Sequence, residues 1–143
     1  MSTGTVKQHV NEVIQAESLE LGGTAVTATA AELNSAADVS GRTLAITASA
    51  AVPAGVQSLL MNHASVAIAA TIASAANHQG IFHVKTVTEP GGGADHTLTL
   101  TAGTFNGTNN VATFADALDA LIVYFDENGA GSILANIGSV ALS

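Results

Sequence analysis

The histidines are the side chains of this chain with the widest range of chemistry, because imidazole can bind a metal, transfer a proton or respond to pH. Zinc sites favour histidines two or four residues apart on one element. No two histidines of this chain have that spacing, so we expect no metal site and no cofactor. The five are His9, His63, His78, His83 and His96.

His83 alternates with Ile81 and Lys85 along an apolar stretch. This alternation predicts an exposed or interfacial side chain rather than a metal ligand. If several copies of the chain met on an axis, one His83 from each could form a ring that binds metal or responds to pH.

Carboxylates and serines offer little catalytic potential in this sequence. Asp116 and Asp119 lie three residues apart, and paired carboxylates can perform general acid–base chemistry, but nothing places this pair in a cleft. Serine is abundant, yet no Gly-x-Ser-x-Gly elbow exposes one as a nucleophile. We therefore predict that the protein is not an enzyme and has no small-molecule substrate.

Two loops carry weak likenesses to ligand-binding motifs. Residues 126–129 read Asp-Glu-Asn-Gly but lack the alternating ligands and the distal glutamate of a calcium loop. A hairpin turn between strands at 120–126 and 132–136 is the simpler interpretation. Gly91-Gly92-Gly93 lacks the basic residue and the following helix that a phosphate site needs, which favours a flexible hairpin tip.

The charge of the chain restricts its partners. Eleven acids stand against three strong bases, Lys7, Arg42 and Lys85, and the formal net charge is -8. We therefore expect no nucleic-acid partner and no anionic membrane surface, since both require Lys and Arg. The first residues lack the apolar run of a signal peptide, and no apolar run reaches transmembrane length. The absence of Cys excludes disulfides and thiol chemistry.

The apolar content favours self-association. It makes up 48% of the chain, but much of it is Ala, and the aromatic residues are only Phe82, Phe105, Phe114, Tyr124 and Phe125. Ala contributes far less to a core than a large side chain does. A monomer would have a thin core, and its surface of small, uncharged residues suits packing against neighbours.

The pattern of elements predicts a mainly β fold, an antiparallel β-sandwich or open barrel with an extended N-terminal arm that contains a short helix. We place the arm at 1–41, with a helix at 5–17, a strand at 24–29 and helical turns at 30–37, and the β-domain at 42–143. Segment 52–62 fits a strand or a helical turn equally. Strands are expected at 42–47, 65–72, 80–88, 96–101, 111–114, 120–125, 132–136 and 139–142.

The strand at 120–125 is apolar on both faces. Leu121, Val123 and Phe125 alternate with Ile122 and Tyr124. This pattern implies a central strand or a second face that another chain covers. We therefore predict that these five residues form core and oligomer contacts.

Two passages resemble structural proteins of tailed bacteriophages. The stretch Val26–Asn34 is similar to one that recurs near anchors in phage fibre and head-fibre proteins. The run His96–Thr113, with the ending Ile137–Ser143, resembles small proteins encoded among phage head genes, some of which are capsid decoration (cement) proteins.

This resemblance implies a protein that binds the exterior of the virion capsid, often as a homotrimer, and clamps major capsid subunits against the pressure of packed DNA. The arm would then contact the capsid, and the β-domain would contact other protomers. The expected arm contacts are Val26, Thr27, Leu33 and Asn34.

Two other functions stay open. A head-fibre, tail-fibre or neck component is supported by residues 26–34, although the chain is short and has no heptad run. A carbohydrate- or receptor-binding module would need exposed aromatic residues, and Phe82, Phe105, Phe114 and Phe125 are expected in the core.

Overall fold

The computed structural model describes residues 20–21, 24–25, 42–91 and 93–143. The chain divides into two compact units, Met1–Asn34 and Ser35–Ser143. In the first, β1 (Glu20–Leu21) pairs antiparallel with β2 (Thr24–Ala25). The helix expected at 5–17, the turns at 30–37 and most of the strand at 24–29 lie outside the described residues.

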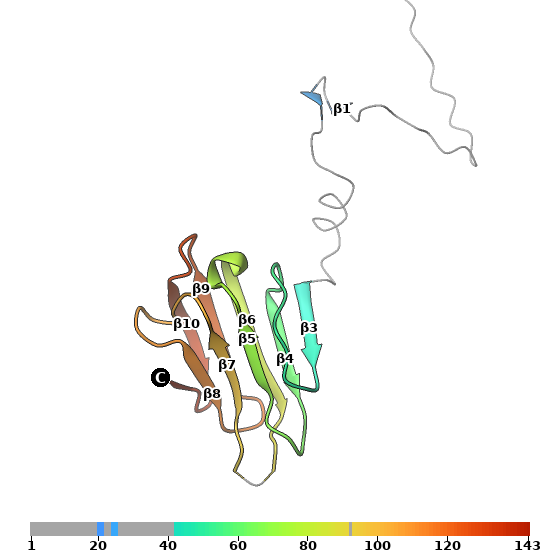
Figure 1. Cartoon of the computed structure of the whole chain (residues 1–143), viewed down its shortest axis with the longest axis vertical. Coiled ribbons are helices and arrows are strands. Elements are labelled where there is room, and N and C mark those ends of the chain that lie inside the picture. The colour runs from blue at the N-terminus through green and yellow to red at the C-terminus, as the bar shows by residue number, and fades with distance from the viewer. Residues whose placement is uncertain (1–19, 22–23, 26–41, 92) are drawn as a thin grey trace, which may run out of the picture. The chain divides into compact units, whose positions relative to one another are not determined.

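The described residues of the second unit form two mixed β-sheets, so the expected mainly β class is confirmed. The five-stranded sheet has the order β10-β9-β6-β4-β3, and the four-stranded sheet has the order β11-β8-β7-β5 (Figure 1). A short 3₁₀ helix, η2 (Ala75–His78), precedes β6. The strands are β3 (Thr43–Ile46), β4 (Ser58–Asn62), β5 (Ala69–Ile72), β6 (Gly80–Thr88), β7 (His96–Leu100), β8 (Val111–Phe114), β9 (Ala120–Phe125), β10 (Gly131–Ile137) and β11 (Ala141–Leu142).

The expectation of antiparallel pairing throughout is wrong for three pairs of strands. β3 with β4, β4 with β6, and β5 with β7 run parallel. The cause is the path of the chain, which passes alternately through the two sheets from β4 to β7. Even between β3 and β4, Ala51 bridges Thr71 of β5. A chain that leaves a sheet and re-enters it after crossing the other one runs again in its first direction.

The loop around Gly91 shows how this path differs from a meander. We expected a hairpin tip there, but the loop carries the chain from β6 in one sheet to β7 in the other. The turns at 106–107 and 126–129 do connect antiparallel neighbours, β7 with β8 and β9 with β10. The ambiguous segment 52–62 ends in the strand β4.

The hydrophobic core draws side chains from both sheets. All four phenylalanines are buried, as expected, with at most 1% of their surface exposed. The ring of Phe125 lies 6.0 Å from that of Phe82 and 6.2 Å from that of Phe105, centroid to centroid. Strand β9 therefore supplies the central aromatic contact of the core from its inner face.

Candidate functional site

Strand β9 has one face in the core and one facing outward. Leu121, Val123 and Phe125 are fully buried. On the opposite face Ile122 is half-buried and Tyr124 is 48% exposed. The strand is paired on both sides, with β6 and β10, so its outward apolar residues are not explained by an edge position.

The neighbouring strand β6 continues this outward face. Ile81 lies opposite Tyr124, His83 opposite Ile122, and Lys85 opposite Ala120. The intervening residues of β6 are buried, so the alternation is regular. Ile81 is 59% exposed, which places a large aliphatic side chain beside the exposed ring of Tyr124.

Strand β10 extends the apolar surface to the edge of the sheet. Ala135 lies opposite Ile122, and Ile137 lies opposite Ala120. A register shift falls at Leu134, and both Leu134 and Ile137 are more than half exposed. No residue of β10 is charged, although charges and prolines are the usual protection of an edge strand.

We call this surface the outer face. Exposed apolar residues that gather on one face, rather than singly, mark interaction surfaces. Within it, Tyr124 and Ile122 are outward residues of the predicted oligomer contact, whereas Leu121, Val123 and Phe125 serve the protomer's own core. Its members, assigned by register and alternation, are Leu60, Ile81, His83, Lys85, Val87, Ala120, Ile122, Tyr124, Ser132, Leu134, Ala135 and Ile137. Ala120 is buried within this set, at 3% exposure.

His83 is half-buried near the middle of the outer face, and it alternates with Ile81 and Lys85 as the sequence predicts. Its Nδ1 lies 3.3 Å from the Ser58 hydroxyl on β4. Burial, and secondarily the positive charge of Lys85, lower the pKa of His83 below its ordinary value of 6.5. The imidazole is therefore held in its neutral form near neutral pH.

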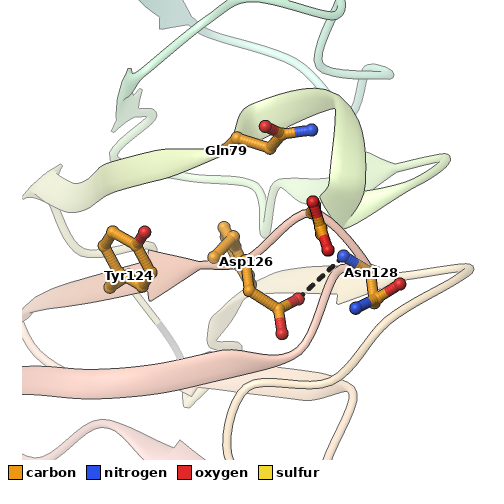
Figure 2. A pocket seen from close by; sticks show the side chains of 6 residues that line it. Gln79, Tyr124, Asp126 and Asn128 are labelled. Atoms are coloured by element: carbon orange, nitrogen blue, oxygen red, sulfur yellow. Dashed lines mark hydrogen bonds between the residues drawn. The ribbon is translucent and has the colours of Figure 1, made fainter.

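A shallow pocket of about 310 Å³ adjoins the Tyr124 end of this face. Figure 2 shows Gln79 on one side of it, with Tyr124, Asp126 and Asn128 along the other. Glu127 completes the polar lining. Asp126 Oδ1 accepts hydrogen bonds from the backbone N–H groups of Asn128 (2.9 Å) and Ala130 (2.8 Å). Asp126 thus shapes the β9–β10 hairpin turn, which confirms the predicted turn at this position.

The carboxylates of Asp116 and Asp119 connect two loops through hydrogen bonds. Asp119 is only 2% exposed, and its carboxylate accepts hydrogen bonds from the backbone N–H of Asp116 (3.1 Å) and of Ser139 (3.0 Å). The Ser139 hydroxyl also donates to Asp116 Oδ2 (2.9 Å). These contacts fasten the β8–β9 loop to the connection between β10 and β11. Among the described residues, no group of three or more His, Asp and Glu side chains is arranged to hold a metal ion.

Two histidines for which the spacing predicts no role are buried. His96 Nδ1 accepts the N–H of Ile68 (2.8 Å), so its Nε2 donates to the carbonyl of Thr88 (2.9 Å). His78 donates from Nδ1 to the carbonyl of Val56, and its ring meets Phe82 edge-on at 5.4 Å. Nothing local in the sequence distinguishes these histidines from exposed ones, because their partners are backbone groups 8 to 28 residues away in the chain.

The structure leaves part of the predicted site undescribed. The expected capsid contacts Val26, Thr27, Leu33 and Asn34 lie outside the described residues. In the described part of the chain, no helix is both long enough and apolar enough to span a bilayer. Comparison of the chain with protein-family models, with curated proteins and with solved structures found no match.

Proposed function

We propose that the protein is a capsid decoration protein of a tailed bacteriophage, which binds the outside of the head and stabilises contacts between major capsid subunits. The observation that carries this proposal is the outer face, a broad apolar surface on a chain with few charges and many acids. A protein whose function is contact needs such a surface and no catalytic centre. The resemblance of residues 96–113 and 137–143 to phage head proteins supplies the location.

The proposed architecture is a β-sandwich with an N-terminal arm. Its support is the single core that receives side chains from both sheets, as in sandwiches that pack two inner faces together. Residues 1–41 form the arm, which meets the major capsid protein through Val26, Thr27, Leu33 and Asn34. Residues 42–143 form the β-domain.

The proposed assembly is a homotrimer held together by the outer face. Ile122 and Tyr124 belong to this contact, because large apolar side chains at these positions are costly to leave in water. The excess of acids disfavours binding to nucleic acid or to an anionic membrane.

The decisive experiment is to image purified virions with and without imposed icosahedral symmetry and to measure the copy number of the protein. Density that repeats over the whole head supports the decoration role. Density at one vertex or on the tail would overturn it in favour of a head-fibre, tail-fibre or neck component. As a functional check, heads that lack the protein should break at a lower temperature than complete heads.

A second candidate, a carbohydrate- or receptor-binding module, gains one observation. Tyr124 is exposed beside the amides of Gln79 and Asn128, and an exposed aromatic ring next to amides can stack on and hydrogen-bond to a sugar ring. Binding of the isolated protein to a glycan array, lost on Tyr124→Ala, would support this function. Absence of binding to glycans and to host cells would remove it.

A further inference from the structure

We infer that the outer face binds a second copy of this chain, with Lys85 of one copy against the Tyr124–Glu127 end of the other. This inference rests on the proposed self-association and names its contact. It follows from the register of the sheet, which places Lys85 and the turn with Asp126 and Glu127 at opposite ends of one apolar surface.

The two ends of the outer face are defined by the pairing of β6 with β9. One end carries Ile81 and Tyr124, and the hairpin turn with Asp126 and Glu127 follows it directly. The other end carries Lys85 opposite Ala120. The four residue-to-residue steps from Ala120 to Tyr124 separate these ends by about 13 Å along the strand.

Lys85 has uncharged neighbours across the sheet. Its partners in register are Leu60 on β4 and Ala120 on β9. An ammonium group that becomes covered in such a setting requires an acid or an aromatic ring from the covering molecule. The chain itself is a source of such groups, since it has eleven acids and only three strong bases.

The position of Lys85 selects among the ways in which copies can meet. If the symmetry axis runs along the strands, residues at the same position along the strands of the two copies meet, and Lys85 of one copy approaches Lys85 of the next. If the axis runs across the strands, the Lys85 end of each copy meets the Tyr124–Glu127 end of its neighbour. The second arrangement pairs a cation with a carboxylate and an aromatic face, so it is favoured over the first.

This head-to-tail contact suits a closed ring. A heterologous contact generates a ring when its rotation closes, and a trimer contains three identical Lys85 contacts. The middle of the outer face, where His83 lies opposite Ile122, then points toward the symmetry axis. A copy of this chain supplies both complementary ends in every such contact.

The test is a charge reversal in the full-length protein. Lys85→Glu and Glu127→Lys each place like charges together, and the double variant restores an opposite pair. Asp95→Lys is the matched control, because it makes the same change of charge as Glu127→Lys at an exposed position in the loop before β7. Sedimentation equilibrium measures association, and circular dichroism melting confirms that each variant folds.

We expect the single variants to raise the dissociation constant at least tenfold, the double variant to recover most of that loss, and Asp95→Lys to associate as wild type. Folded single variants that assemble normally would overturn the inference. So would a folded double variant that stays as dissociated as Lys85→Glu, or a wild-type protein that is monomeric at all concentrations. None of these results changes where the protein lies on the virion, so the proposed function fails or survives separately.

A mixture of the two single variants gives an additional result. A ring of three cannot alternate the two variants, so one mismatched contact remains and we expect only partial recovery of the trimer. Complete recovery as a dimer would support the Lys85 contact and overturn the trimer. No heteromeric species at all, with both variants folded, would overturn the contact.

Discussion

The carboxylate of Asp119 occupies the space that a side chain at Gly138 would need. A β-carbon on Gly138 would overlap the Asp119 carboxylate, and Gly138 has a φ of +86°, which favours glycine. The contact brings the β10–β11 connection close enough for the Ser139 N–H to reach Asp119. The position of the last strand therefore depends on a residue without a side chain.

We predict that Gly138→Ala lowers the free energy of unfolding by about 3 kcal/mol, because it adds a steric overlap and backbone strain and breaks the part-buried hydrogen bond from Ser139 N–H to Asp119. Urea unfolding followed by circular dichroism measures the loss. Gly107→Ala is the control, since Gly107 also has a φ of +86° but no atom within 4 Å of its added β-carbon. It should cost only about 1 kcal/mol of backbone strain. Equal losses for the two variants would show that the Asp119 contact contributes nothing.

The buried His96 predicts a second, independent loss of stability. Replacement by Leu leaves the N–H of Ile68 and the carbonyl of Thr88 without their partner, and each unpaired buried group costs about 1–3 kcal/mol. We therefore expect His96→Leu to lower the urea midpoint strongly. His63→Leu is the comparison, because the hydrogen bonds of His63 to the N–H groups of Ser65 and Val66 lie in an exposed loop. A similar, small change in both variants would contradict the role assigned to His96.

The lowered pKa of His83 predicts a dependence on pH with a definite sign. Burial holds the folded-state pKa below 6.5, so as the pH falls through that value the unfolded state takes up a proton before the folded state does. The free energy of unfolding is therefore highest above pH 6.5, and it decreases as the pH falls from 6.5 toward the lower pKa of the folded state. Between about pH 8 and about pH 5, wild type should lose more stability than His83→Gln does.

Protonation of His83 should also affect association, because His83 lies in the middle of the outer face, which points toward the proposed symmetry axis. Sedimentation at the two ends of this pH range, repeated with a chelator, tests whether a ring of His83 side chains responds to pH or metal. Unchanged association under all of these conditions would eliminate the ring. It would leave the stability difference between wild type and His83→Gln as the only effect of His83.

The features of this fold that neighbouring residues determine could be predicted from the sequence, and those that depend on distant strands could not. The alternation in β6, β9 and β10 and the burial of the four phenylalanines are local patterns, and they predicted the strands and much of the core. Parallel pairing has no local signal. The short loop around Gly91 looks like a hairpin, and only the positions of β5 and β7 in the other sheet show that it is a crossover.

Only the part of the candidate site that lies within one strand could be predicted from the sequence. The two-sided apolar pattern of residues 121–125 predicted a central strand or a face that another chain covers, and β9 lies in the sheet between β6 and β10. The neighbours on that face come from elsewhere in the chain, since Ile81 meets Tyr124 through a pairing of strands some forty residues apart. Lys85 and Glu127 could not be assigned to opposite ends of one surface before this register was known.

Ile122 and Val123 provide the most direct test that the two faces of β9 have different roles. Val123→Asp places a charge in the fully buried core without a partner, and we expect a loss of several kcal/mol, on the order of 4 kcal/mol, that prevents folding. Ile122→Asp changes the adjacent residue on the outer face, so the protomer should still fold while association weakens. Melting by circular dichroism and sedimentation equilibrium separate these outcomes. A trimer of Ile122→Asp with the melting temperature of wild type would mean that this face stays exposed to water, because a charge buried between protomers without a partner cannot be neutral in energy.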